Sequence, residues 1–155
     1  MKKLFFILTI FGLINFSIVN AENFPDDTEE FNGHHYAVID RHMDFETAQE
    51  FCKSRGGHLV TITSEDENIF IKELIHRYAT RNFYRTGGLK NNSDEWTWIT
   101  GEKFSYSDWF KGEPKNSTVV IFKDAKIGFN TYWKTAEKDE ENPAEDYGLI
   151  CEWDF

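Results

Sequence analysis

The residues of this chain whose chemistry is simplest to define are its two cysteines. Cys52 and Cys151 are the only cysteines among 155 residues, and Cys151 lies four residues from the end. If they pair, the bond closes a loop of about 100 residues, worth about 4–5 kcal/mol in chain-entropy models. Disulfides persist in oxidising compartments. The two cysteines therefore favour an exported protein whose ends are joined.

Acidic and amide side chains are the second group with a definable chemistry, because their oxygens can bind a cation. The chain has 27 acidic and 17 basic residues and a net charge of −10. This charge opposes nucleic acid and anionic membranes, so neither is an expected partner. Carboxylate and amide oxygens can hold calcium, which takes six to eight oxygen ligands. Glu113 and Asn116 are candidate ligands, and an acidic stretch follows at residues 137–146. A solvated acidic surface is the simpler alternative.

Other reactive groups give weaker signals. His34, His35 and His42 could suggest a transition-metal site, but adjacent residues of a strand point to opposite faces and rarely share one ion. Serine and histidine residues lie in no recognisable catalytic motif. Acid pairs are unavoidable in so acidic a chain and do not by themselves indicate a glycosidase. These groups therefore identify no catalytic site, although a glycan-acting enzyme stays open as an alternative.

The first 21 residues have the pattern of a secretory signal peptide. Lys2 and Lys3 precede an apolar run from Leu4 to Val19, and small residues precede an expected cut after Ala21. An uncleaved anchor is the alternative. We assign residues 22–33 to a short acidic leader and residues 34–155 to one folded domain. The expected location is secreted, periplasmic or cell-surface, with no membrane insertion after cleavage.

Two helices should open the domain. Asp44 is a predicted N-cap for a helix that carries Cys52 on its apolar face, and Gly56 and Gly57 should end it. Ser64 and Glu67 form a predicted capping box for a second helix. Its expected buried stripe is Phe70, Ile71, Leu74, Ile75 and Tyr78.

Short strand-like segments follow the helices. They are rich in aromatic and β-branched residues and are separated by polar turns. Two other segments lie earlier in the chain: a strand expected at 35–40, before the first helix, and a short β-branched run at 59–63, between the helices. The segments after residue 80 are 83–89, 96–99, 118–122 and 147–153. This order of elements predicts an α+β domain with two helices and short antiparallel sheets.

Several segments occur in an order typical of one known family. A helix with a cysteine runs into a Gly-His-Leu turn, and the chain closes on Gly-Leu-Ile-Cys-Glu-Trp. The remaining matches are Ser64–Asn68, Gly87–Leu89, Trp96–Trp98 and Ser107–Trp109. Together they resemble the C-type lectin-like domain over about residues 34 to 153. The resemblance implies the fold, a long loop region that binds ligands, and an end-to-end disulfide between Cys52 and Cys151.

The resemblance also implies where calcium and sugar would bind. Sugar-binding members carry a Glu-Pro-Asn or Gln-Pro-Asp triplet, a further acid soon after it, and a downstream Trp-Asn-Asp triplet. Here the first motif reads Glu-Pro-Lys-Asn, so Lys115 replaces an oxygen ligand and Asn116 comes one position late. The downstream motif reads Trp-Lys-Thr at residues 133–135. We therefore predict that the usual calcium site is degraded; a rearranged site is the alternative.

The resulting hypothesis is an exported module that binds a carbohydrate or a protein surface through its long loop region. No cofactor is certain, and calcium is possible at Glu113 and Asn116. The alternative for Trp109 and Trp133 is core packing, which the family favours. The candidate contact residues are Glu113, Lys115, Asn116, Trp109, Phe110, Tyr132 and Trp133.

Overall fold

The computed structural model describes residues 28–123, 131–138 and 146–154. The predicted signal peptide, Asp124 and most of the acidic stretch fall outside these ranges. No helix in the described ranges is long and apolar enough to cross a membrane.

The helices begin where the capping residues predict. Helix α1 spans Phe45–Lys53, and the Asp44 carboxylate accepts a hydrogen bond from the Thr47 backbone N–H at 2.6 Å. Helix α2 spans Glu65–Tyr78 after the N-cap Ser64. The Glu67 carboxylate does not close the expected box on Ser64, because it accepts from the Thr63 N–H at 2.8 Å and from the Tyr36 hydroxyl. It therefore joins the start of α2 to the sheet.

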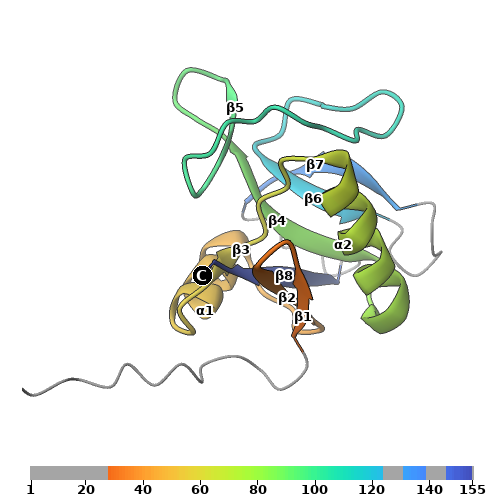
Figure 1. Cartoon of the computed structure of the whole chain (residues 1–155). Coiled ribbons are helices and arrows are strands. Elements are labelled where there is room, and N and C mark those ends of the chain that lie inside the picture. Colours follow the sequence, from red (N-terminus) through yellow and green to blue (C-terminus); the bar gives the residue numbers. More distant parts are fainter. Residues whose placement is uncertain (1–27, 124–130, 139–145, 155) are drawn as a thin grey trace, which may run out of the picture.

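Eight strands form one connected sheet (Figure 1). The main path runs β1-β2-β8-β4-β6-β7, while β3 pairs with β8 and β5 pairs with β4. The other strand pairings are antiparallel, as expected, whereas the β4–β8 pairing is parallel and was not expected. The strands are β1 (Glu29–Phe31), β2 (His34–Ile39), β3 (His58–Leu59), β4 (Phe83–Lys90), β5 (Trp96–Trp98), β6 (Val119–Lys123), β7 (Tyr132–Ala136) and β8 (Tyr147–Trp153).

Four expectations from the sequence need correction. Strand β1 lies within the residues assigned to the leader, yet it pairs with β2, so the folded domain begins before residue 34. Strand β7 was not anticipated, and the run at 59–63 is a strand only at Leu59 and its neighbour His58. Tyr78 does not belong to the buried stripe of α2; it is 49% exposed, and its hydroxyl donates to Glu29 at 2.5 Å.

The sheet is buried on both faces, which explains the apolar runs in β6 and β8. Val119 and Ile121 pack with α1, while Val120 and Phe122 pack with α2 on the other face. Cys52 and Cys151 form the expected disulfide within the α1 core, with their Cα atoms 5.6 Å apart. The bond fixes α1 to β8, so both ends of the domain are held by one rigid scaffold.

Candidate functional site

The long loop region runs from the end of β5 to the start of β6, over residues 99–118. In Figure 1 it crosses the end of the molecule opposite α1. Backbone hydrogen bonds attach it to β7: the Phe110 N–H donates to the Trp133 carbonyl at 2.8 Å, and the Trp133 N–H donates to the Asp108 carbonyl at 3.0 Å. A turn then closes through Glu113, and the Glu113–Pro114 bond is cis. The loop is thus a fixed surface beside β7.

The Glu113 carboxylate is directed into the protein. Its side chain is only 6% exposed. One oxygen, Oε2, accepts from the Thr135 hydroxyl at 2.7 Å and from the N–H groups of Thr135 and Lys115 at 3.1 Å each. The other oxygen, Oε1, lies 3.8 Å from the Lys115 Nζ. Glu113 therefore connects the loop to β7, and Lys115 supplies a positive charge beside it.

These contacts change the acidity of Glu113. Burial alone raises the pKa of the carboxyl, but hydrogen bonds from Thr135 and Lys115 outweigh it, so the pKa lies below the ordinary value of 4.5. The carboxylate is consequently charged and satisfied at neutral pH. A cation at Glu113 would have to compete with three hydrogen bonds and a lysine.

Asn116 is the other candidate calcium ligand. It is exposed. Within the described ranges, no group of three or more histidine or acidic ligands includes Glu113. Asp124 and residues 139–145 of the acidic stretch lie outside those ranges.

Trp133 is a core residue, which corrects its assignment as a candidate ligand contact. Its side chain is fully buried, and its indole N–H donates to the Asn68 Oδ1 at 3.0 Å. The rings of Trp98 and Trp109 pack edge-on against it, each with centroids 5.8 Å away. Trp109 is half-buried against the same core. Packing, the alternative given for both tryptophans, accounts for Trp133 fully.

Phe110 and Tyr132 lie at the surface beside the loop. The Phe110 side chain is 41% exposed, and its ring centroid lies 5.7 Å from that of Tyr132. The Lys123 Nζ lies 5.0 Å from the Phe110 ring, and the Lys72 Nζ lies 4.9 Å from the Tyr132 ring. We call these four residues the Phe110 patch. Its aromatic faces can stack on apolar or sugar C–H surfaces, and its lysines can donate hydrogen bonds.

Sequence reasoning missed the two lysines of the Phe110 patch. Lys72 is positioned because it lies four residues after Asn68 on α2, so both side chains face the same way. Both contact the Asp108 carboxylate in the loop, Asn68 at 2.9 Å. The four-residue spacing of Asn68 and Lys72 can be read from the sequence, but the sequence does not show that both contact Asp108.

The described residues have the fold of C-type lectin domains. The C-type lectin domain of murine dendritic cell inhibitory receptor 2, solved in complex with N-glycan, superposes with a TM-score of 0.70 at 26% identity, covering 84% of this chain and 98% of that one. The family model for the lectin C-type domain matches residues 41–152. The chain therefore belongs to the C-type lectin domain family, whose members are binding proteins.

Two curated proteins are similar to this chain in sequence. Snaclec B1 of Macrovipera lebetinus is 31% identical over 104 residues, which cover 65% of this chain and 68% of that protein. One polypeptide of the snaclec coagulation factor IX/factor X-binding protein of Trimeresurus stejnegeri is 34% identical over 92 residues. That alignment covers 55% of this chain and 60% of the relative.

Proposed function

We propose that this protein is an exported binding module that recognises a carbohydrate or a protein surface through the Phe110 patch, without calcium in the long loop region. The observation that carries the proposal is the internal use of Glu113. One oxygen of its carboxylate is held by Thr135 and Lys115, and the Lys115 ammonium group lies 3.8 Å from the other, so an ion would have to compete with both. Ligand binding then depends on side chains at the surface.

The Phe110 patch suits that role because it combines one exposed aromatic ring with three partly buried, chemically different side chains. Phe110 is anchored through its backbone to Trp133, so the exposed ring is presented at little entropic cost. Aromatic residues of this kind often dominate binding energy at interfaces. Lys72 is itself held by Asp108, which positions its ammonium group at the edge of the patch.

The relatives support two ligand classes. The receptor domain named above was solved with an N-glycan, and the Trimeresurus stejnegeri snaclec is named as a protein that binds coagulation factors. Neither name indicates an enzyme. Export is supported by the N-terminal pattern and by the disulfide, which requires an oxidising compartment.

The proposal is tested with the secreted protein on a glycan array and on an array of extracellular proteins, each in calcium and in EDTA. We expect ligands whose binding is equal in both buffers. Phe110→Ala should weaken binding at least about tenfold, which corresponds to about 1.4 kcal/mol.

The matched control is Ile69→Ala, because Ile69 is similarly exposed at 48% but lies outside the patch. Binding lost in EDTA would favour the alternative, a rearranged calcium site. Equal effects of the two substitutions would place the ligand elsewhere, and turnover of a glycan would favour the enzyme.

A further inference from the structure

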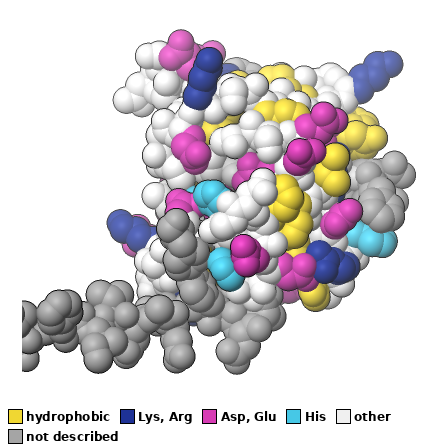
Figure 2. Space-filling model, viewed as in Figure 1, with side chains coloured by type: hydrophobic (Ala, Val, Ile, Leu, Met, Phe, Trp, Pro, Cys, Tyr) yellow, Lys and Arg dark blue, Asp and Glu magenta, His cyan; other side chains and the backbone are white. Residues whose placement is uncertain are grey.

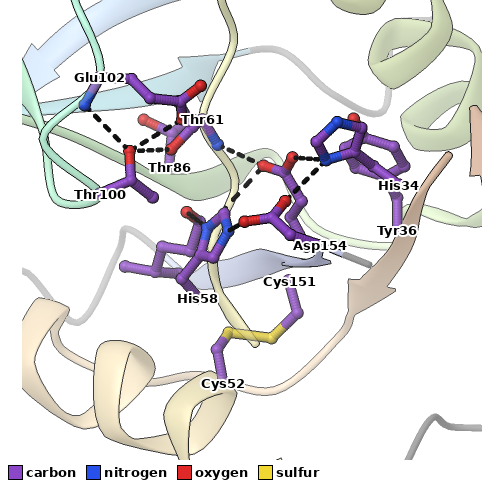
Figure 3. A network of polar contacts seen from close by, with 12 residues as sticks. His34, Tyr36, Cys52, His58, Thr61, Thr86, Thr100, Glu102, Cys151 and Asp154 are labelled. Atoms are coloured by element: carbon purple, nitrogen blue, oxygen red, sulfur yellow. Dashed lines mark hydrogen bonds and ion pairs between the residues drawn. A yellow bond between two sulfur atoms is a disulfide. The ribbon is translucent and has the colours of Figure 1, made fainter. Parts of the chain in front are cut away.

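Two histidines and two carboxylates meet at the end of β8, outside the Phe110 patch. We call His34, His58, Glu152 and Asp154 the His34 cluster. Strands β2 and β3 both pair with β8, and the register sets His35 opposite Trp153 and His58 opposite Glu152. The sheet therefore brings one histidine to each side of the same strand end. Figure 3 shows His34 and His58 on opposite sides of Asp154.

The ligand atoms of three of these residues lie close together. The His34 Nδ1 lies 2.6 Å from the Asp154 Oδ1 and 3.1 Å from the Glu152 Oε1. The three ligand atoms all lie within 4.8 Å of one another. A tetrahedral zinc ion with bonds of about 2.0–2.1 Å keeps its ligands about 3.3 Å apart. Small side-chain rotations are therefore enough to place all three around one ion.

His58 is built to hold Asp154. Its Nδ1 lies 2.9 Å from the Leu59 carbonyl oxygen. Its Nε2 lies 3.0 Å from the Asp154 Oδ2, the oxygen turned away from His34. Outer partners of this type commonly orient metal-binding carboxylates. His58 can thus fix one oxygen of Asp154 and leave the other for an ion.

One carboxylate of the His34 cluster is buried and hydrogen-bonded to the backbone. Glu152 is 2% exposed, and its Oε2 accepts from the Thr61 N–H at 2.8 Å. In the described ranges no lysine or arginine forms an ion pair with Glu152 or Asp154.

A small cavity of about 110 Å³ lies beside the cluster. His34, Glu67, Glu102 and Glu152 contribute to its walls. A polar cavity of this size holds water, which can complete a metal coordination shell. Figure 2 shows histidine and acidic side chains next to each other on the face in view.

We propose that His34, Glu152 and Asp154 bind one divalent first-row transition metal ion, with Zn²⁺ the best match, and that His58 positions Asp154. An imidazole with two carboxylates and water suits zinc-type coordination. The ion would join the start of β2 to the end of β8, one residue beyond the disulfide at Cys151. The site is independent of ligand binding at the Phe110 patch.

The test is a Zn²⁺ titration of the secreted protein against a chromophoric chelator, with Co²⁺ absorption as a second reading of coordination. We expect one ion per chain. His34→Gln and Asp154→Asn should each weaken binding at least about tenfold, and His58→Gln about 10–100-fold. The matched control is His35→Gln, because His35 is adjacent on β2 but outside the cluster; its affinity should match that of the wild type.

Thermal melting with and without Zn²⁺ is a second measurement, which still tests the proposal if one variant folds poorly. Bound Zn²⁺ should raise the melting temperature of the wild type and of His35→Gln, but not that of Asp154→Asn, whose side chain is 57% exposed and tolerant of change. Absence of stoichiometric Zn²⁺ binding by the wild type would overturn the proposal. Equal affinities of His34→Gln and His35→Gln would also overturn it, since the carboxylates alone would then be holding the ion.

Discussion

Thr135 donates both its hydroxyl and its backbone N–H to a single oxygen of Glu113, at 2.7 and 3.1 Å. Thr135 is the last residue of the Trp-Lys-Thr motif, and Glu113 is the first of Glu-Pro-Lys-Asn. The two segments that resemble calcium-binding motifs thus contact each other directly through hydrogen bonds. The loop is held to β7 by a carboxylate whose partners are protein groups.

The first prediction concerns the strength of this contact. Glu113→Gln keeps the shape of the side chain but removes its charge, and hydrogen bonds to charged groups contribute about 1.5–3 kcal/mol. We expect the free energy of unfolding to fall by about 1–2 kcal/mol, measured by urea denaturation. An unchanged unfolding free energy would show that the contact is not structural.

The second prediction is a pH dependence of the same contact. The pKa of Glu113 is lowered in the folded protein, so its stabilising contribution is present above the ordinary value of 4.5 and is lost as the pH falls through the lowered pKa. The stability difference between wild type and Glu113→Gln should therefore be constant near neutral pH and shrink in acid. Urea denaturation across the acid range measures it. A difference that grows on acidification would have the wrong sign.

The third prediction separates core from surface aromatics. Trp133→Phe leaves the buried Asn68 Oδ1 without the indole N–H, and an unsatisfied buried acceptor costs about 1–3 kcal/mol. We expect a loss of unfolding free energy of that size. Phe110→Ala serves as the comparison and should change stability much less, because its ring is 41% exposed. The opposite order would show that the roles of the two rings are reversed.

The fourth prediction tests the cap of α1. Asp44→Ala removes the acceptor for the Thr47 N–H, and loss of an N-cap costs about 1 kcal/mol. Glu50→Ala on the same helix removes only an exposed contact to Lys53 and should cost less than about 0.5 kcal/mol. Thermal melting of both variants checks the difference. Equal losses would mean that the cap does not hold the helix that carries Cys52.

Local signals in the sequence were enough to predict the helices and the closing strand. Asp44 and Ser64 mark helix starts because capping is decided within four residues, and the apolar run at 147–153 predicts β8. Strand β1 was not predicted because Glu29 and Glu30 show no apolar alternation. The strand forms through its pairing with β2. The parallel β4–β8 pairing joins segments more than 60 residues apart, which local patterns do not encode.

The same distinction applies to the sites. Lys115 and Lys134 predict a loss of calcium ligands, because lysine cannot coordinate calcium. The burial of the Glu113 carboxylate could not, because it depends on β7 lying beside the loop. The His34 cluster could not be predicted either, because the carboxylate partners of His34 come from the far end of the chain through sheet register.

Calcium titration by isothermal calorimetry, on wild type and Glu113→Gln, tests the central claim most directly. If Glu113 is a structural contact, no calcium should bind at the long loop region more tightly than about 1 mM, the weak limit for extracellular modules. Any weaker or distant binding should be identical in the two proteins. Stoichiometric calcium binding tighter than about 1 mM in the wild type that disappears in Glu113→Gln would contradict the account.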